Sequence, residues 1–257
     1  MSKVDNKDLF QTLIEIRQLL FRIIDTKYVS AKKKQGSIGE AQREEFKKEA
    51  KITVEDLCSS IIYKIELLAS KLLTIKSFDW NKFHNFQSCR DPKDDNRVCQ
   101  QLHGGAFVVS CKDKETMEHF IFTEITTFIS NIGGVIDNVA LLIERAFILD
   151  IKGIVLLDKI YDQLSDGPLR DFLKKYTKEK YNFWGMRYIR TACEHQDLTK
   201  VFQYGEKAGL GKRDLKIPYI NDDIRKLDTP EENRIDLYCE FLHEKTCDFI
   251  QEFAIAL

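Results

Sequence analysis

The stretch from Thr116 to Asp150 constrains the fold most, because it is the longest and most apolar helical pattern in the chain. Its large apolar residues recur at steps of three and four and cover more than one side of a helix: Phe120, Ile121, Ile125, Phe128, Ile132, Ile136, Val139, Leu142 and Ile143. A helix that is apolar on several sides is typical of the centre of a domain. We therefore expect a central helix over residues 116–150.

Two features of this helix predict special packing. Gly133 and Gly134 lie in its middle, where each glycine costs up to about 1 kcal/mol relative to alanine. We expect a second helix to cross closely at this point, because a missing side chain lets two helices approach. Asp137 follows among apolar residues, and its carboxylate needs a polar partner if it is buried.

Apolar periods elsewhere predict the other helices. They cover residues 7–28, 40–75 (one long helix or a broken pair), 153–164, 169–180, 181–195 and 229–257, with a loop over 31–37, a short further segment over 198–208 and a loop over 209–228. The chain has only 12 glycines and 4 prolines in 257 residues, which argues against a many-turned β-sandwich or barrel. The fold class predicted is all-α, a helical bundle of about seven helices in a single domain over residues 1–257.

The helical period fails between residues 76 and 112, which we interpret as an irregular insert. Residues 104–110 have the composition of one short strand or a buried extended segment. The spacing Cys99-x3-His103 could form half of a zinc site, with Cys89 or His84 in the other half. No CxxC pair occurs and the spacings match no familiar zinc finger. We therefore expect these residues to pack in the ordinary way, with no metal and no cofactor.

The N-terminal segment and the cysteines indicate the compartment. The first apolar stretch is interrupted by charges, unlike a signal or transit peptide. The apolar span 120–149 contains four charged residues, Glu124, Asp137, Glu144 and Arg145, which disfavours a bilayer helix. Seven cysteines without a signal peptide indicate reduced thiols. We expect a cytoplasmic protein with no membrane segment, in which Cys58, Cys193, Cys239 and Cys247 act as small core residues.

Charge and motifs exclude several function classes. The formal net charge of −1 gives no evidence for a generally basic nucleic-acid binder, although a local basic face remains open. The sequence contains no GxxxxGK[ST], no GxGxxG after a strand, no HExxH and no GxSxG. The common phosphate-loop, dinucleotide, zinc-protease and serine-hydrolase signatures are therefore missing.

The pair Arg190 and His195, late in a predicted helix, forms the sharpest candidate site. An imidazole can move protons near neutral pH, and a guanidinium can hold a phosphate with two hydrogen bonds. Together these two groups suffice in type for metal-free cleavage of a phosphodiester. We assign Arg190 and His195 as candidate catalytic residues, and Arg187, Glu194 and Asp137 as candidate substrate-binding residues.

The segment Arg190-Thr191-Ala192-Cys193-Glu194-His195 resembles the motif of the HEPN superfamily, helical domains marked by an Arg and a His with four to six residues between them. Residues 131–140, which contain Asp137, are similar to an early helix of some members, and the resemblance covers about residues 115–257. It implies that two protomers place Arg190 and His195 face to face in one RNA-cleaving or nucleotide-binding site. It also implies a homodimer and a cognate antitoxin-type partner. Thr191 stands where the family usually has Asn, Asp or His.

A non-catalytic interpretation stays open beside this one. Arg190 and Glu194 are spaced i,i+4, so they can form a surface ion pair, and His195 can interact with the C-terminal end of its helix. In that case the chain is a helical protein-interaction domain in which the Arg190–His195 pair is structural, and the insert contacts the partner.

Overall fold

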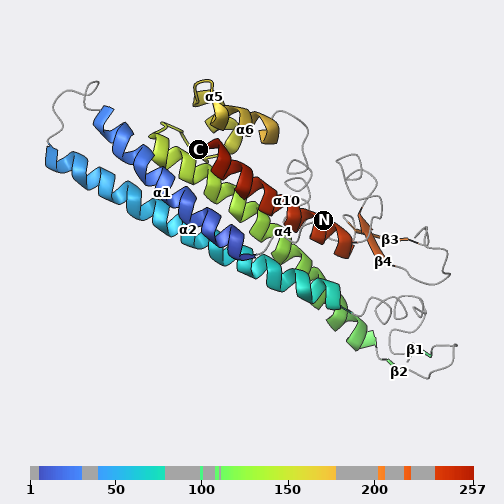
Figure 1. Ribbon diagram of the computed structural model, residues 1–257. Coiled ribbons are helices and arrows are strands. Elements are labelled where there is room, and N and C mark those ends of the chain that lie inside the picture. Colours follow the sequence, from blue (N-terminus) through green and yellow to red (C-terminus); the bar gives the residue numbers. More distant parts are fainter. Residues whose placement is uncertain are drawn as a thin grey trace. The chain divides into compact units, whose positions relative to one another are not determined.

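Six helices account for most of the residues that the computed structural model describes, which are 6–30, 40–78, 99–100, 108–109, 111–177, 202–205, 217–220 and 235–257 (Figure 1). They are α1 (Asn6–Ser30), α2 (Glu40–Ser77), α4 (Cys111–Phe147), α5 (Leu157–Gln163), α6 (Pro168–Thr177) and α10 (Ile235–Ala256). The predicted all-α class is confirmed.

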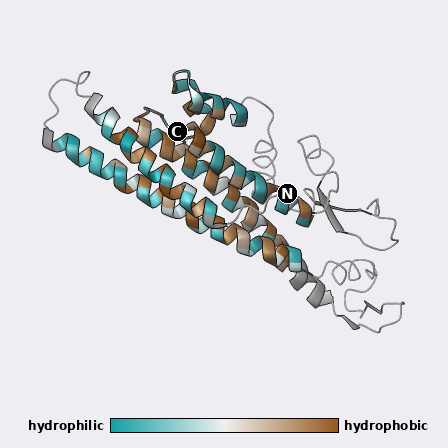
Figure 2. Ribbon diagram, in the orientation of Figure 1, coloured by the Kyte–Doolittle hydropathy of each residue, from teal (hydrophilic) through white to brown (hydrophobic). Residues whose placement is uncertain are grey.

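The long helices follow the predicted periods closely. The period over 40–75 is one unbroken helix rather than a pair, and Pro168 is the first residue of α6, as expected for a residue without a backbone N–H. Brown and teal segments alternate along each long helix in Figure 2, as amphipathic periodicity requires. The predicted helix over 181–195, the loop over 31–37 and the start of the last helix at Thr229 lie outside the described residues.

Two short antiparallel hairpins add to the helices. Strand β1 (Cys99–Gln100) pairs with β2 (Val108–Val109), so part of the insert expected to be extended at 104–110 is a strand. Strand β3 (Phe202–Gly205) pairs with β4 (Ile217–Ile220). The second pair corrects the sequence interpretation, which had a short further segment and a loop there. Aromatic and β-branched residues in both segments favour strand, and Pro218 is tolerated because each strand of a two-stranded sheet has a free edge.

The connection between α4 and α5 also differs from the expectation. A helix was predicted from Gly153, but α5 begins at Leu157, and Gly153 has a φ of +79° that belongs to a turn. The Lys159 ammonium donates to the carbonyl of Ile154 (2.9 Å), and the Gln163 side-chain amide donates to the carbonyl of Asp150 (3.0 Å). Side chains of α5 therefore hold the backbone of the connection, which satisfies carbonyls that a helix would have bonded.

The chain divides into two compact units. Unit 1 comprises Met1–Leu68, Asn131–Trp184 and Leu242–Leu257, and unit 2 comprises Ala69–Ser130 and Gly185–Phe241. The divisions fall within α2, α4 and α10. In unit 1, α1 contributes to the core with one face, on which Leu9, Leu13, Ile16, Leu20 and Ile24 are each at most 2% exposed, whereas α4 is buried on more than one side.

Ion pairs join neighbouring helices in both units. In unit 1, α1 lies beside α2 (Figure 1), where Arg17 contacts Glu55 at 3.2 Å and Asp25 accepts hydrogen bonds from Lys47 and Lys51. These two bonds hold the pKa of Asp25 below its ordinary value. In unit 2, Lys71 of α2 lies 2.8 Å from Glu124 of α4, and both side chains are largely buried.

By length and composition alone, His119–Phe147 of α4 could cross a membrane, and half of its most apolar window is buried in the protein. The central helix of a soluble domain meets the same criteria. Glu124 within this span is ion-paired with Lys71, and its buried apolar residues include Phe128 and Val139. The apolar character of α4 is thus accounted for by its place in the core.

Helix α4 ends with an unusual backbone at Ile148. Its φ of 56° is left-handed, and the N–H of Leu149 donates to the carbonyl of Glu144 at 3.1 Å. This bond closes a Schellman motif, in which the left-handed residue is usually glycine. Ile148 is 45% exposed, so burial of its side chain does little to offset the backbone strain of a β-branched residue.

Replacing Ile148 by glycine is therefore expected to raise the free energy of unfolding by about 1 kcal/mol, since a left-handed conformation costs a residue with a Cβ roughly 1–2 kcal/mol. Urea denaturation followed by circular dichroism measures the change. Ile148→Ala is the matched control, because it shortens the side chain but keeps the Cβ. Equal stability of the glycine and alanine variants would contradict the strain at this position.

Candidate functional site

Four of the five predicted site residues, Arg187, Arg190, Glu194 and His195, lie outside the described residues. The structure therefore neither brings them together nor separates them. Asp137 is the fifth, and it lies in the part of α4 that belongs to unit 1. The site can be built only from Asp137 and from the helix that precedes residues 178–201.

Asp137 is half-buried in α4 and has an interaction partner within the protein, as a carboxylate among apolar residues requires. The next residue, Asn138, is 9% exposed, and its Nδ2 donates no hydrogen bond within the described structure. An amide buried in this way is costly, because a lost hydrogen bond to water is not replaced. Two adjacent polar residues thus interrupt the apolar surface of α4 one turn after Gly134.

At Gly134 a lysine side chain, rather than the backbone of the crossing helix that was predicted, fills the space left by the missing side chain. A Cβ on Gly134 would lie 2.6 Å from Cε of Lys64, which belongs to α2, and the Lys64 ammonium donates to Ser60 Oγ at 2.7 Å. The neighbour is the flexible end of a lysine rather than a backbone. The glycine therefore leaves room for a lysine stem that lies across α4.

Alanine at position 134 should have a small net effect, because two contributions oppose each other. Alanine favours the helix by about 1 kcal/mol, but it displaces Lys64 from its bond to Ser60. We expect Gly134→Ala to change the free energy of unfolding by less than about 0.5 kcal/mol in the wild-type background, and to stabilise by about 1 kcal/mol when Lys64 is alanine. Urea denaturation of the wild type, the two single variants and the Gly134→Ala, Lys64→Ala double variant tests this expectation. An equal effect of Gly134→Ala in both backgrounds would show that Lys64 does not restrict position 134.

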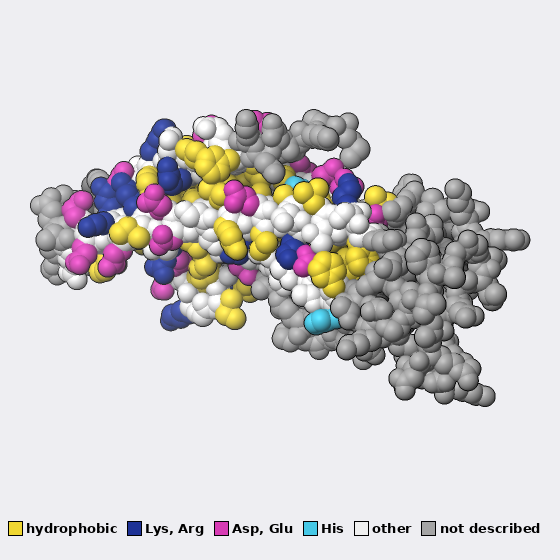
Figure 3. Space-filling model, turned by 90° about the horizontal axis from the view of Figure 1, so that it is seen from below, with side chains coloured by type: hydrophobic (Ala, Val, Ile, Leu, Met, Phe, Trp, Pro, Cys, Tyr) yellow, Lys and Arg dark blue, Asp and Glu magenta, His cyan; other side chains and the backbone are white. Residues whose placement is uncertain are grey.

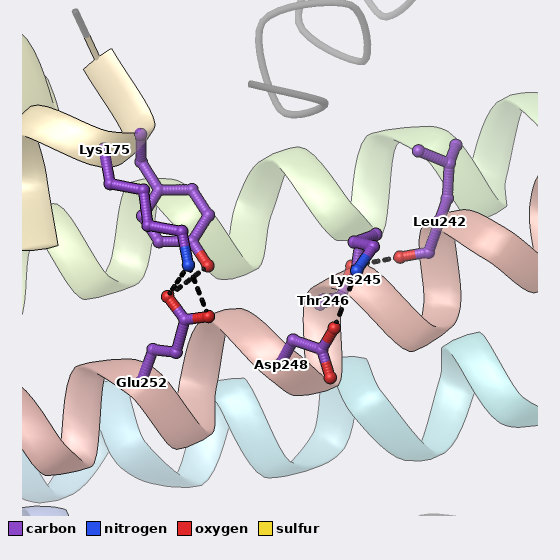
Figure 4. Close-up of polar contacts among 7 residues, drawn as sticks. Lys175, Leu242, Lys245, Thr246, Asp248 and Glu252 are labelled. Atoms are coloured by element: carbon purple, nitrogen blue, oxygen red, sulfur yellow. Dashed lines mark hydrogen bonds and ion pairs between the residues drawn. The ribbon is translucent and has the colours of Figure 1, made fainter. Parts of the chain in front are cut away.

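Helix α6, which directly precedes residues 178–201, is fixed to α10 by a polar cluster. Lys175 Nζ contacts both carboxylate oxygens of Glu252, at 2.6 and 2.7 Å, and the Tyr176 hydroxyl donates to Glu252 Oε2 at 2.8 Å. Figure 4 shows Lys175 and Glu252 pointing toward each other from the two helices. Two donors on one carboxylate fix the end of α6 in position and in rotation.

An aromatic cluster lies beside this polar one. The Phe172 ring lies 5.2 Å from the Phe249 ring and 5.8 Å from the Phe253 ring, measured between centroids. The Tyr176 ring meets Phe249 edge-on at 4.9 Å. Phe172, Tyr176, Phe249 and Phe253 are all buried, so α6 is anchored by apolar area as well as by charge.

The sequence reasoning missed this anchor. Tyr176 and Glu252 are 76 positions apart, and no local pattern links them. The sequence held only a weaker signal for this contact. Lys175 and Glu252 each lie on an amphipathic helix, next to large apolar residues at the border of the buried face.

No metal site is found among the described residues. They contain no group of three or more His, Cys, Asp or Glu side chains that could hold an ion. The side chains of His84, Cys89, Cys99, His103 and Cys111, which bear on the zinc alternative, lie outside that part of the chain.

Three of the cysteines expected in the core are there. Cys58, Cys239 and Cys247 are buried and form no disulfide, and Cys193 is not among the described residues. Burial raises the pKa of Cys58 and of Cys247 to about 11. Thiolate is scarce at neutral pH under these conditions, so these side chains are packing residues rather than nucleophiles.

Comparison with known proteins adds no relative. No protein-family model matches the chain, and no curated protein and no solved structure matches it.

Proposed function

We propose that the chain is an HEPN-like protein that acts as a homodimer and either binds RNA or cleaves it without a metal. The observation that carries the proposal is the sequence Arg190-x4-His195 late in a predicted helix. The all-α fold is compatible with it. A cytoplasmic location and a cognate antitoxin-type partner belong to the same proposal.

The proposed reaction uses the 2′-hydroxyl of RNA as its nucleophile. His195 takes a proton from this hydroxyl or gives one to the leaving 5′-oxygen, and Arg190 stabilises the charge on the phosphorus oxygens in the transition state. The new bond joins the 2′-oxygen to phosphorus, and the bond to the 5′-oxygen breaks. The products are a 2′,3′-cyclic phosphate and a 5′-hydroxyl.

The remaining candidate residues bind substrate in this proposal. Arg187 contacts a neighbouring phosphate, while Glu194 and Asp137 accept hydrogen bonds from sugar or base. Helix α6, held to α10 through Glu252, provides a fixed starting point for residues 178–201 along the chain.

The test is cleavage of varied single-stranded and structured RNAs by the purified protein in EDTA. We expect cleavage to persist in EDTA and to leave 2′,3′-cyclic phosphate ends, identified by mass spectrometry. Activity that EDTA removes, or products with a 3′-hydroxyl, would contradict the proposed mechanism.

A further inference from the structure

The side of α2 that faces solvent carries a regular stripe of seven residues. They follow one another at alternating steps of four and three: Glu45, Glu49, Ile52, Asp56, Ser59, Tyr63 and Glu66. All seven are exposed, and they lie opposite the residues with which α2 enters the core, such as Val54 and Ile61. We call these seven residues the outer stripe. The steps place them along one line of the helix.

The outer stripe is acidic. Four of its seven residues are carboxylates and none is basic. None of the four forms an ion pair within the described part of the chain, whereas Glu55, just beside the stripe, is paired with Arg17 at 3.2 Å. Glu45 and Glu49 are spaced i,i+4, and like charges at that spacing destabilise a helix.

Two large apolar side chains interrupt the acidic residues. Ile52 is 49% exposed and Tyr63 is 65% exposed. They are eleven positions apart, which is about three turns or about 16 Å along the helix. Figure 3 looks from below at the side on which α2 lies in Figure 1, and it shows yellow and magenta side chains next to one another there, with dark blue ones among them. Apolar side chains bordered by polar ones match the general plan of a protein-binding surface, which has an apolar centre and a polar rim.

We propose that the outer stripe is the docking surface for a basic amphipathic helix of a protein partner. Residues 45–66 span about 30 Å, which fits a partner helix of about 22 residues. Its apolar residues would cover Ile52 and Tyr63, and its lysines and arginines would face Glu49, Asp56 and Glu66. This is recognition of an amphipathic helix by a complementary face.

Charge decides between this occupant and the two nearest alternatives. A second copy that used the same stripe in a twofold dimer would place carboxylates against carboxylates. RNA is a chain of phosphates, and the stripe would repel it. The surface is therefore separate from any RNA-binding face, and the inference does not depend on the proposed ribonuclease activity.

The experiment uses a synthetic probe on the full-length protein. The probe is a fluorescent 22-residue helical peptide with leucine at steps of three and four and lysine beside it. A second peptide has glutamate in place of every lysine. We expect saturable binding of the lysine peptide, measured by fluorescence anisotropy, that weakens as salt rises, and no binding of the glutamate peptide.

Two sets of variants locate the binding on the protein. Glu49→Lys, Asp56→Lys and Glu66→Lys together should weaken binding about tenfold or more. Ile52→Ser with Tyr63→Ser should also weaken it, without any change of net charge. The matched control is Asp150→Lys, Asp171→Lys and Glu244→Lys, three exposed carboxylates away from the stripe, which should change the affinity less than about twofold.

Three outcomes would overturn the inference. They are equal loss of binding in the stripe and control variants, equal binding of the two peptides, and full affinity in the Ile52→Ser, Tyr63→Ser variant. Sedimentation of the same variants identifies the second copy as occupant: a wild-type dimer that the stripe reversal converts to monomer would assign the stripe to self-association instead.

Discussion

Replacing His195 by alanine is expected to abolish RNA cleavage, with a loss of about 100-fold or more, since a positioned general acid–base contributes roughly 10²–10⁴ in rate. No other histidine stands in a comparable setting, because His119 and His243 have no arginine within six positions, and His84 and His103 fall in the predicted irregular insert. The fold should persist, as a residue at the end of a predicted helix contributes little core area. Single-turnover cleavage of a labelled RNA measures the loss.

Arg190→Ala separates binding from chemistry in the same assay. Its charge serves both the bound substrate and the transition state, so we expect weaker RNA binding and slower cleavage together. His119→Ala is the control, because His119 is exposed on α4 and has no place in the proposed site. If the His195→Ala variant cleaves RNA as fast as the wild type, His195 is not the catalytic residue. Complete inactivity of a well-folded wild-type dimer would favour the non-catalytic interpretation, in which Arg190 and Glu194 form an ion pair.

The largest expected loss of stability comes from Phe172→Ala. The Phe172 ring is 6% exposed and contacts the rings of Phe249, Phe253 and Tyr176. Removing a buried phenylalanine costs about 3–5 kcal/mol, through lost burial and through the cavity that remains. We expect a fall of this size in the free energy of unfolding, measured by urea denaturation.

Two further measurements make the Phe172 result specific. Phe10→Ala removes a ring that is 50% exposed, and it should cost under about 1 kcal/mol. Hydrogen exchange should show faster exchange of the α6 amides in Phe172→Ala, because α6 loses its main apolar contact with α10. A loss under about 1 kcal/mol with unchanged exchange in α6 would show that the ring contacts do not anchor this helix.

Local sequence patterns predicted the long helices because the spacing of apolar residues that marks a buried face lies entirely within each helix. The five buried positions of α1 recur at steps of three and four. Helix α2 ends two residues after its predicted span, while α4 begins five residues before its predicted start, inside the predicted insert, and ends three residues before its predicted end. Hairpin β3–β4 could not be predicted in this way, since each strand has four residues and its stability depends on a partner twelve or more positions away. The start of α5 was misplaced because a turn at Gly153 interrupts an otherwise apolar run.

In the candidate site, too, contacts with a local sequence signal could be predicted and long-range contacts could not. A glycine in mid-helix is a local signal, and it indicated that something packs closely at Gly134; the occupant is the Lys64 side chain and not the helix backbone that was predicted. The partners of Glu252 were not foreseen, since Lys175 and Tyr176 reach it from another helix. Long-range contacts of this kind appear only once the helices are placed, whereas Arg190 and His195 were proposed from chemistry and spacing alone.

The buried thiols have a consequence for how the chain reaches its native state. Cys58, Cys239 and Cys247 are closed off once α2 and α10 are packed, but in the unfolded chain all seven thiols are open to solvent with ordinary pKa values. A disulfide formed at that stage from any of these three would have to be broken before its sulfur could take its place in the core. Oxidant should therefore modify these three thiols far more when it is present during refolding than when it is added afterwards, so that their oxidation is a hazard of the folding pathway.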